Sequence, residues 1–167
     1  FAGGENSVEE RNFLLNETIL DGDIGVTGVT TDNAYHVVVG SGSVGTAALS
    51  GFTITRGNAS LNMTGGPVVN GNTIQRRLGG GIMLYSSSPT INNCNITGNA
   101  AILNGGGVYF AVASSGMAFS NCTISNNICP SGAGLYLTTI TTGSTFSNCI
   151  ITNNTATSSG GGIYAVS

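Results

Sequence analysis

Short segments of alternating apolar and polar residues fill the C-terminal half of the chain, and the same arrangement returns after every cluster of glycines. The clusters begin at Gly79, Gly105, Gly132 and Gly160, so the repeats are 26, 27 and 28 residues long. Alternation with a period of two predicts β-strands, because a helix would space its apolar residues three or four apart. A fixed spacing of this length indicates a repeat protein.

Each repeat contains three alternating segments. The first segment turns a column of large side chains outward, because successive residues of a strand face opposite sides; this column is Met83, Tyr109, Tyr136 and Tyr164. The second segment ends in an inward apolar residue, and the third holds an inward cysteine followed by an inward isoleucine. We therefore expect the core to contain Phe119, Phe146, Ile96, Ile124, Ile151 and an unbridged cysteine column of Cys94, Cys122 and Cys149.

A tight corner separates the second segment from the third. Ile91 and Cys94 both face inward but lie three residues apart, so the alternation slips by one residue. A two-residue corner explains the slip. Asparagine tolerates the left-handed backbone that such a corner needs, and stacked asparagines hydrogen-bond through their amides. The expected corner column is Asn93, Asn121 and Asn148.

Three short strands per turn with equivalent residues stacked predict an all-β parallel β-helix, with coils about 4.8 Å apart. We expect one domain over residues 1–167 with about five coils. The first and last of these coils are expected to be incomplete, and the ends to be uncapped. Residues 1–56 form irregular first coils, 57–78 a long loop insertion and 79–167 the regular coils. In the early coils Leu49 aligns with Ile91, and Val37 and Val39 are expected to face inward.

The phrases "FAGGENSVEER", "NETILDGDIG", "YHVVVGSG" and "LSGFTITRGNA", followed by "GGGI" and "SSPTINNCNITGN" repeats, resemble right-handed parallel β-helix repeat proteins of bacteria and archaea. The repeats are also similar to those of polymorphic outer-membrane proteins. The resemblance covers nearly the whole chain. It implies a right-handed solenoid that is secreted or displayed at the cell surface. Such repeats serve adhesins, surface fibres and polysaccharide enzymes, so the resemblance leaves the function open.

Charge is scarce and unevenly placed. The formal net charge is −3, all seven carboxylates lie between Glu5 and Asp32, and no charged residue or histidine follows Arg77. The chain therefore has no basic patch for nucleic acid. No apolar run reaches the roughly 18 residues of a membrane span.

The same scarcity argues against an enzyme. Glycoside hydrolysis needs two carboxyl groups, and lyase chemistry needs a base with a stabilising cation. The regular coils contain neither, so we expect no catalytic residue. Asp21 and Asp23 are the one close acidic pair on an expected strand end, and we interpret them as a turn that bonds backbone amides. The cysteine spacings do not suit zinc, and we expect no metal or cofactor. Asn58 and Asn62 are the sequons best placed for glycosylation.

The favoured hypothesis is an extracellular structural protein that stacks head-to-tail on copies of itself as a fibre subunit, because neither end carries a polar cap. The expected assembly interface is Phe1, Ala2, Ile163, Tyr164, Ala165 and Val166. The same ends also suit a piece of a longer protein. The alternative is a module of a cell-surface adhesin that contacts glycans or a receptor through the tyrosine column. A polysaccharide-active enzyme fragment and an ice-binding array of outward threonines are less favoured.

Overall fold

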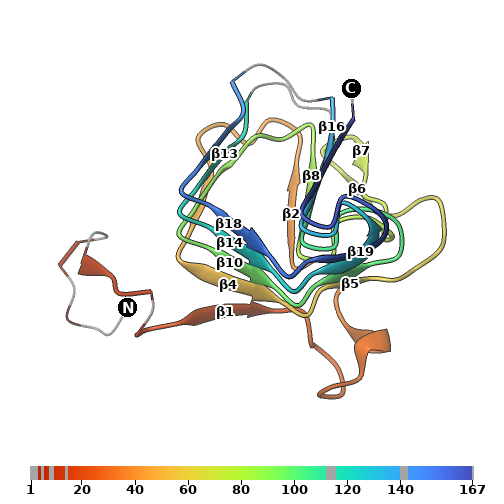
Figure 1. Ribbon diagram of the computed structural model, residues 1–167, viewed down its shortest axis with the longest axis horizontal. Helices are drawn as coiled ribbons and strands as arrows, with labels where there is room; N and C mark the ends of the chain where they lie inside the picture. The colour runs from red at the N-terminus through yellow and green to blue at the C-terminus, as the bar shows by residue number, and fades with distance from the viewer. Residues whose placement is uncertain are drawn as a thin grey trace.

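The computed structural model describes residues 4, 6–7, 10–13, 15–111, 116–139 and 143–166. Within them, strands stack in parallel into ladders that run along a coiled chain (Figure 1). The first ladder consists of β2 (Val38–Ser41), β8 (Ile82–Tyr85), β12 (Val108–Ala111), β16 (Leu135–Thr138) and β20 (Ile163–Val166). The second consists of β3 (Ala48–Ser50), β9 (Thr90–Asn92), β13 (Ala118–Ser120) and β17 (Thr145–Ser147).

Two further ladders complete each coil. The third consists of β1 (Thr18–Asp21), β4 (Phe52–Thr55), β10 (Asn95–Thr97), β14 (Thr123–Ser125) and β18 (Ile150–Thr152). The fourth consists of β5 (Asn58–Ala59), β11 (Ala100–Ala101), β15 (Ile128–Ser131) and β19 (Thr155–Ser159). The parallel β-helix is as expected, but the sequence predicted three strands per coil and the structure adds the fourth ladder. Its first two strands have only two residues each, too few to display any alternation.

The coils are named here in chain order: β2–β5 form the first, β8–β11 the second, β12–β15 the third and β16–β19 the fourth. Strand β1 precedes the first coil, and β20 follows the fourth. The pairing of Leu49 with Ile91 is confirmed. In the early first ladder, Val37 packs against the core as expected. Val38 also packs there and pairs with Ile82, whereas Val39, which was expected to face inward, is 42% exposed. Three consecutive valines gave the sequence pattern no means of choosing the phase.

The core runs up the inside of the coils. Equivalent isoleucines of the third ladder, Ile54, Ile96 and Ile124, are fully buried. Such burial contributes about 1.5–3 kcal/mol for each side chain. Phe119 is also fully buried, and its ring stacks on that of Phe146 with centroids 5.3 Å apart.

The last coil departs from the expected burial. Phe146 is 37% exposed, and Ile151 and Cys149 are only partly buried. All three occupy the same inward columns as their buried counterparts in earlier coils. They differ because, among the described residues, only β20 lies beyond the fourth coil.

Left-handed backbone marks the corners. Asn93, Asn121 and Asn148 have φ of 51°, 52° and 52°, which places the predicted corner column where the alternation slips. Gly105, in a glycine cluster, has φ of 67°, and a Cβ there would lie 2.5 Å from the Val108 carbonyl oxygen. These corners therefore use residues that adopt positive φ at low cost.

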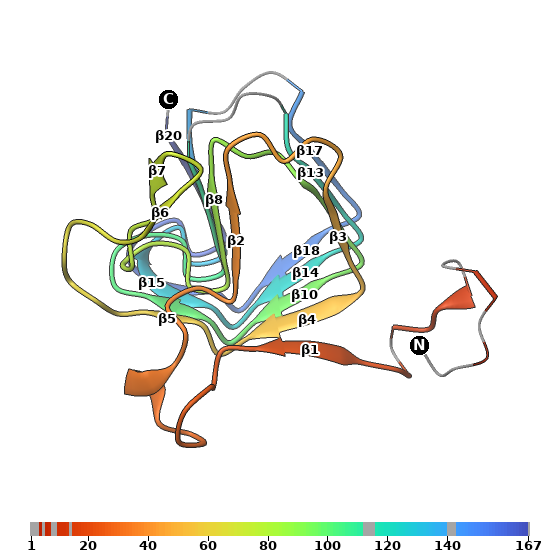
Figure 2. The same ribbon diagram turned by 180° about the vertical axis from the view of Figure 1, so that it is seen from behind.

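The expected 57–78 insertion is shorter than predicted, because Asn58–Ala59 forms β5 and Leu78 bridges to Asn104. Between them, β6 (Val68–Val69) and β7 (Asn72–Thr73) pair as an antiparallel hairpin. The hairpin lies against the outer face of the first ladder (Figures 1 and 2). Its turn is anchored on Ser41, whose Oγ donates to the Val69 carbonyl at 2.7 Å.

Candidate functional site

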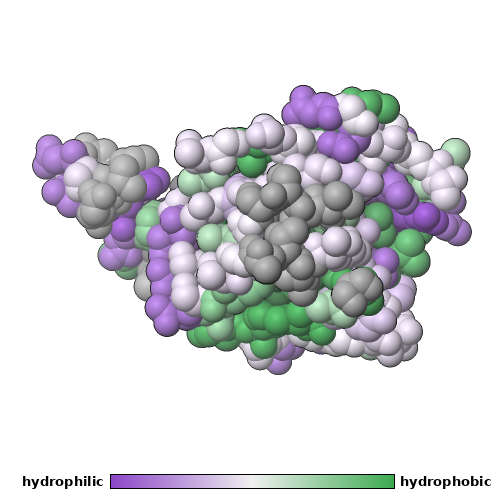
Figure 3. All heavy atoms as spheres, turned by 90° about the horizontal axis from the view of Figure 1, so that it is seen from above, coloured by the Kyte–Doolittle hydropathy of each residue, from purple (hydrophilic) through white to green (hydrophobic). Residues whose placement is uncertain are grey.

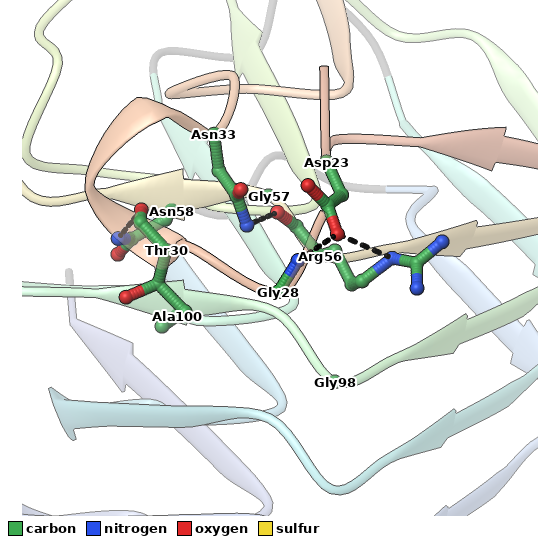
Figure 4. A pocket seen from close by; sticks show the side chains of 9 residues that line it. All are labelled: Asp23, Gly28, Thr30, Asn33, Arg56, Gly57, Asn58, Gly98 and Ala100. Carbon is green, nitrogen blue, oxygen red and sulfur yellow. Dashed lines mark hydrogen bonds and ion pairs between the residues drawn. The ribbon is translucent and has the colours of Figure 1, made fainter. Parts of the chain in front are cut away.

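The segment between β1 and β2 forms a loop. Backbone hydrogen bonds hold this loop against the corner between β4 and β5. Gly22 N donates to the Thr55 carbonyl, Ala34 N to that of Gly22 and Asn58 N to that of Ala34, each at 2.8 Å. A short helical turn, η2 (Thr30–Asp32), lies within this loop. Between loop and corner lies a cavity of about 210 Å³ (Figure 4), lined by Asp23, Gly28, Thr30, Asn33, Arg56, Gly57, Asn58, Gly98 and Ala100.

Arg56 lies closer to Asp21 than to Asp23, the two members of the acidic pair. Its guanidinium forms an ion pair with Asp21, including an Nε to Oδ1 hydrogen bond of 2.6 Å, and its Nε lies 4.0 Å from Asp23 Oδ2. Asp21 Oδ1 also accepts from Asp23 N, and Asp23 Oδ2 from Gly28 N, both at 2.9 Å. The pair therefore orders a turn, as the sequence suggested.

Two buried side-chain oxygen atoms of this loop have no hydrogen-bond partner within the described ranges. Asp23 Oδ1 and Asn33 Oδ1 are buried and accept no hydrogen bond from any described residue. The Asp23 side chain is only 4% exposed, whereas that of Arg56 is 50% exposed. The sequence gave no signal for these atoms, because Asn33 lies ten residues from Asp23 and the loop brings them to one cavity.

Residues of the insertion cover the first two side chains of the outward column, Met83 and Tyr109. Met83 is fully buried and Tyr109 is 9% exposed, because Ile74 and Leu78 of the insertion pack on them. The Tyr109 and Tyr136 rings stack with centroids 5.4 Å apart, and burial is the main cause that raises the pKa of both phenols.

Further along the column, the Tyr136 and Tyr164 rings stack at 5.2 Å, and both side chains are half-buried. The column is thus partly a second core and only partly an open surface.

Of the residues expected to form the assembly interface, the structure describes only those of β20. Phe1 and Ala2 lie outside the described residues. Ile163 belongs to the inward column that contains Leu135, yet it is 46% exposed. Tyr164, Ala165 and Val166 complete β20, which is the edge strand of the first ladder.

The asparagine corner column has a counterpart that the sequence analysis missed. Asn148 Nδ2 donates to Asn121 Oδ1 at 3.3 Å in the predicted column. A second column, the inner asparagine ladder, consists of Asn99, Asn127 and Asn154, of which the first two are buried. Asn127 Oδ1 accepts from Asn99 N at 3.0 Å, and Asn154 Oδ1 likewise accepts from Asn127 N. The recurring Asn before each fourth strand was the available signal.

The cysteine column is buried where coils cover it. Cys94 and Cys122 are 2% and 1% exposed, and all four cysteines are free thiols. The hydrogen bond between these two thiols, and after it their burial, raises the pKa of Cys122. Each sulfur also lies close to a backbone carbonyl oxygen, Cys94 Sγ 3.2 Å from that of Asn92 and Cys122 Sγ 3.3 Å from that of Ser120. Small buried hydrophobic residues with satisfied donors are the simplest description.

The two candidate glycosylation sites differ. Asn62 is exposed, but the Asn58 amide donates to the Thr30 carbonyl at 2.6 Å and is half-buried. A glycan on Asn58 would break that contact. No helix in the described part of the chain has the length and apolarity needed to cross a bilayer. In the same part, no three His, Cys, Asp or Glu side chains group as metal ligands.

Comparison with known proteins agrees with the ladders. The family model described as "Right handed beta helix region" matches residues 9–167. No curated protein and no solved structure matches the chain. The match covers almost the whole sequence and shows the fold and its handedness, whereas the activity is not decided by it. The chain belongs to the right-handed β-helix family.

Proposed function

We propose that this β-helix is a non-enzymatic, extracellular structural protein whose copies stack head-to-tail into a fibre. The observation that carries the proposal is the open face of the last coil. Phe146 in the fourth coil and Ile163 in β20, which follows it, occupy inward columns of the core and are nevertheless 37% and 46% exposed. Figure 3 shows an apolar patch along the lower edge of the molecule, on the side of the last coil. Burying such residues under a further coil would stabilise the contact by about 25 cal/mol per Å² of apolar surface.

The two ends of the solenoid have complementary partial coils. Strand β20 adds a first-ladder strand beyond the fourth coil, and β1 adds a third-ladder strand before the first coil. If β20 of one copy pairs with β2 of the next, β1 of that next copy comes to lie on β18. Each copy then supplies a half of the junction coil that the other lacks. Parallel pairing of free strand edges gives affinity, and the apolar columns set the register.

The apolar hollow at the start of the solenoid supports the same arrangement. It is lined by inward residues of the first and second coils, including Val38, Leu49, Ile82 and Leu84. A contact between two different surfaces does not close on itself, so it propagates as a filament. Edge strands usually escape such pairing through charged side chains, and the chain has none after Arg77.

The distribution of charged groups also supports a structural role. The three coils that begin at β8 contain no carboxylate, base or cation. The Asp21 and Arg56 side chains are engaged with each other. General acid–base chemistry on a polysaccharide would need free groups of this kind within reach of the bond to be cleaved.

Sedimentation velocity and electron microscopy of the purified chain test the proposal. We expect the wild type to form concentration-dependent linear polymers. Ile163→Lys should reduce them strongly, because it places a charge in the junction core. The matched control is Ile150→Lys in β18 of the fourth coil, which β20 follows. Ile150 pairs with the outward Thr123 and is 61% exposed, so its replacement should leave polymerisation unchanged.

A wild type that remains monomeric at high concentration would rule out the fibre. Equal polymerisation by both lysine variants would show that the last coil is not the junction. In either case the tyrosine column would become the better candidate surface, since Tyr136 and Tyr164 are only half-buried.

A further inference from the structure

The loop between β1 and β2 holds two buried oxygens that accept no hydrogen bond from the described part of the chain. Asp23 Oδ1 and Asn33 Oδ1 both belong to residues that line the cavity of about 210 Å³ (Figure 4). The Asp23 side chain is 4% exposed, so solvent covers little of its charge. An unpaired polar atom in such a position is costly, and a charged one more so. The cavity therefore suits an occupant that carries positive charge.

The orientation of both groups is fixed by their other atoms. Asp23 Oδ2 accepts from Gly28 N at 2.9 Å, and Asn33 Nδ2 donates to the Arg56 carbonyl at 2.8 Å. Rotating the Asn33 amide would set its oxygen against that carbonyl, which can only accept. Both spare atoms are thus acceptors, and no protein donor among the described residues reaches them.

The surrounding charge favours a cation. Asp23 and Asp32 lie in the loop and Asp21 ends β1, whereas one arginine, Arg56 in the corner between β4 and β5, faces them. That arginine, Arg56, forms its short contacts with Asp21 and approaches Asp23 Oδ2 only to 4.0 Å. A water molecule takes about 30 Å³ of liquid volume, so the cavity has room for an ion with part of its hydration shell.

We propose that this cavity binds Ca²⁺, with Asp23 Oδ1 and Asn33 Oδ1 as protein ligands and water completing the shell. Carboxylate and amide oxygens are ligands that Ca²⁺ prefers, and it accepts irregular geometry, whereas Mg²⁺ demands a near-ideal octahedron. One carboxylate oxygen and one amide oxygen make a weak site, comparable with extracellular modules of Kd about 10⁻⁴–10⁻³ M. The residues of this calcium site are not those of the proposed fibre junction, so the two proposals can be tested separately.

Thermal unfolding of the whole chain tests the site. The melting temperature is measured with chelator, with 10 mM CaCl₂ and with 10 mM MgCl₂ at one ionic strength. With a Kd of about 1 mM, this Ca²⁺ concentration raises the ratio of folded to unfolded protein about tenfold. For a chain of this length we expect a rise of about 3–6 °C with Ca²⁺ and clearly less with Mg²⁺. No rise with Ca²⁺ would mean that water alone fills the cavity, and an equal rise with both ions would overturn the proposal.

Two asparagine variants locate the effect. Asp23→Asn preserves an acceptor for Gly28 N but removes the charge from the cavity, so it should abolish the calcium shift. Asp32→Asn is the matched control, because Asp32 lies in the same loop, is exposed and already accepts from Val26 N at 2.7 Å.

The control should keep the shift. In chelator, Asp23→Asn should be at least as stable as the wild type, since it no longer buries a carboxylate whose Oδ1 has no partner among the described residues. Loss of the shift in both variants would indicate diffuse attraction of calcium and would contradict the site.

Discussion

Replacing Asn127 with alanine removes the central rung of the inner asparagine ladder. Asn127 is fully buried in the third coil. Its Oδ1 accepts from Asn99 N at 3.0 Å and from Asn99 Nδ2 at 3.1 Å. Its Nδ2 donates at 3.0 Å to both the Ile96 carbonyl and Asn154 Oδ1. The ladder thus ties three successive coils together at the corner before the fourth strands.

The expected loss of stability follows from these partners. Asn99 Nδ2 also donates to Ile54 and Thr97, so it keeps partners after the replacement. Asn99 N–H, in contrast, would become an unsatisfied buried donor, which costs about 1–3 kcal/mol. The two bonds donated by Asn127 contribute about 0.5–1.5 kcal/mol each. Asn127→Ala should therefore lower the free energy of unfolding by about 2–6 kcal/mol.

Urea unfolding followed by far-ultraviolet circular dichroism measures this loss, because the chain has no tryptophan. With a denaturant slope of about 2 kcal/mol/M, the midpoint should fall by about 1–3 M. The control is Asn95→Ala, at a partly exposed outward position of β10; changes away from buried polar partners stay within about 0.5 kcal/mol. Similar midpoints for the two variants would refute a stabilising role for the ladder.

The remaining predictions concern the core, pH and the thiols. Ile124→Ala, at a fully buried position, should cost about 2–5 kcal/mol in the same urea assay; a loss below 1 kcal/mol would contradict the assigned phase of the third ladder. Burial lowers the pKa of His36, with a smaller effect of Arg76, so protonation favours the unfolded chain. Stability should be constant above about pH 6.5, the ordinary histidine pKa, and fall below it, and His36→Gln should remove that part of the fall. Cys149, alone among the four cysteines in being only partly buried, should react first with a thiol reagent in native protein; four equally fast thiols would disprove the buried column.

Features that repeat along the chain were predictable from sequence. The stacked columns and the asparagine corner follow from alternation and from a slip that recurs in each repeat. An Asn recurs before each fourth strand, but Asn127 and its neighbours were missed because the recurrence alone does not tell a buried asparagine from an exposed one. Only the structure shows that it accepts from the backbone of the preceding coil.

The non-repeating parts were less predictable. Strict alternation along "YHVVVG" would turn His36 outward, yet His36 is half-buried and its Nδ1 lies 2.9 Å from the Gly79 carbonyl oxygen. The cavity beside Asp23 depends on loop closure through the contact between Asn33 and Arg56, which are 23 positions apart. No local pattern reports such a contact. The exposure of Phe146 likewise depends on what lies above its coil rather than on its own repeat.

Electron cryo-microscopy of the assembled protein tests the proposed head-to-tail stacking most directly. A junction coil shared between β20 of one copy and β1 of the next gives five coils for each subunit, with four formed within a copy. At about 4.8 Å for each coil, the axial rise should be about 24 Å per subunit. A filament with this rise and a continuous first ladder across the junction is the predicted result. Filaments joined side by side, or protein that stays monomeric at the highest attainable concentration, would contradict the account.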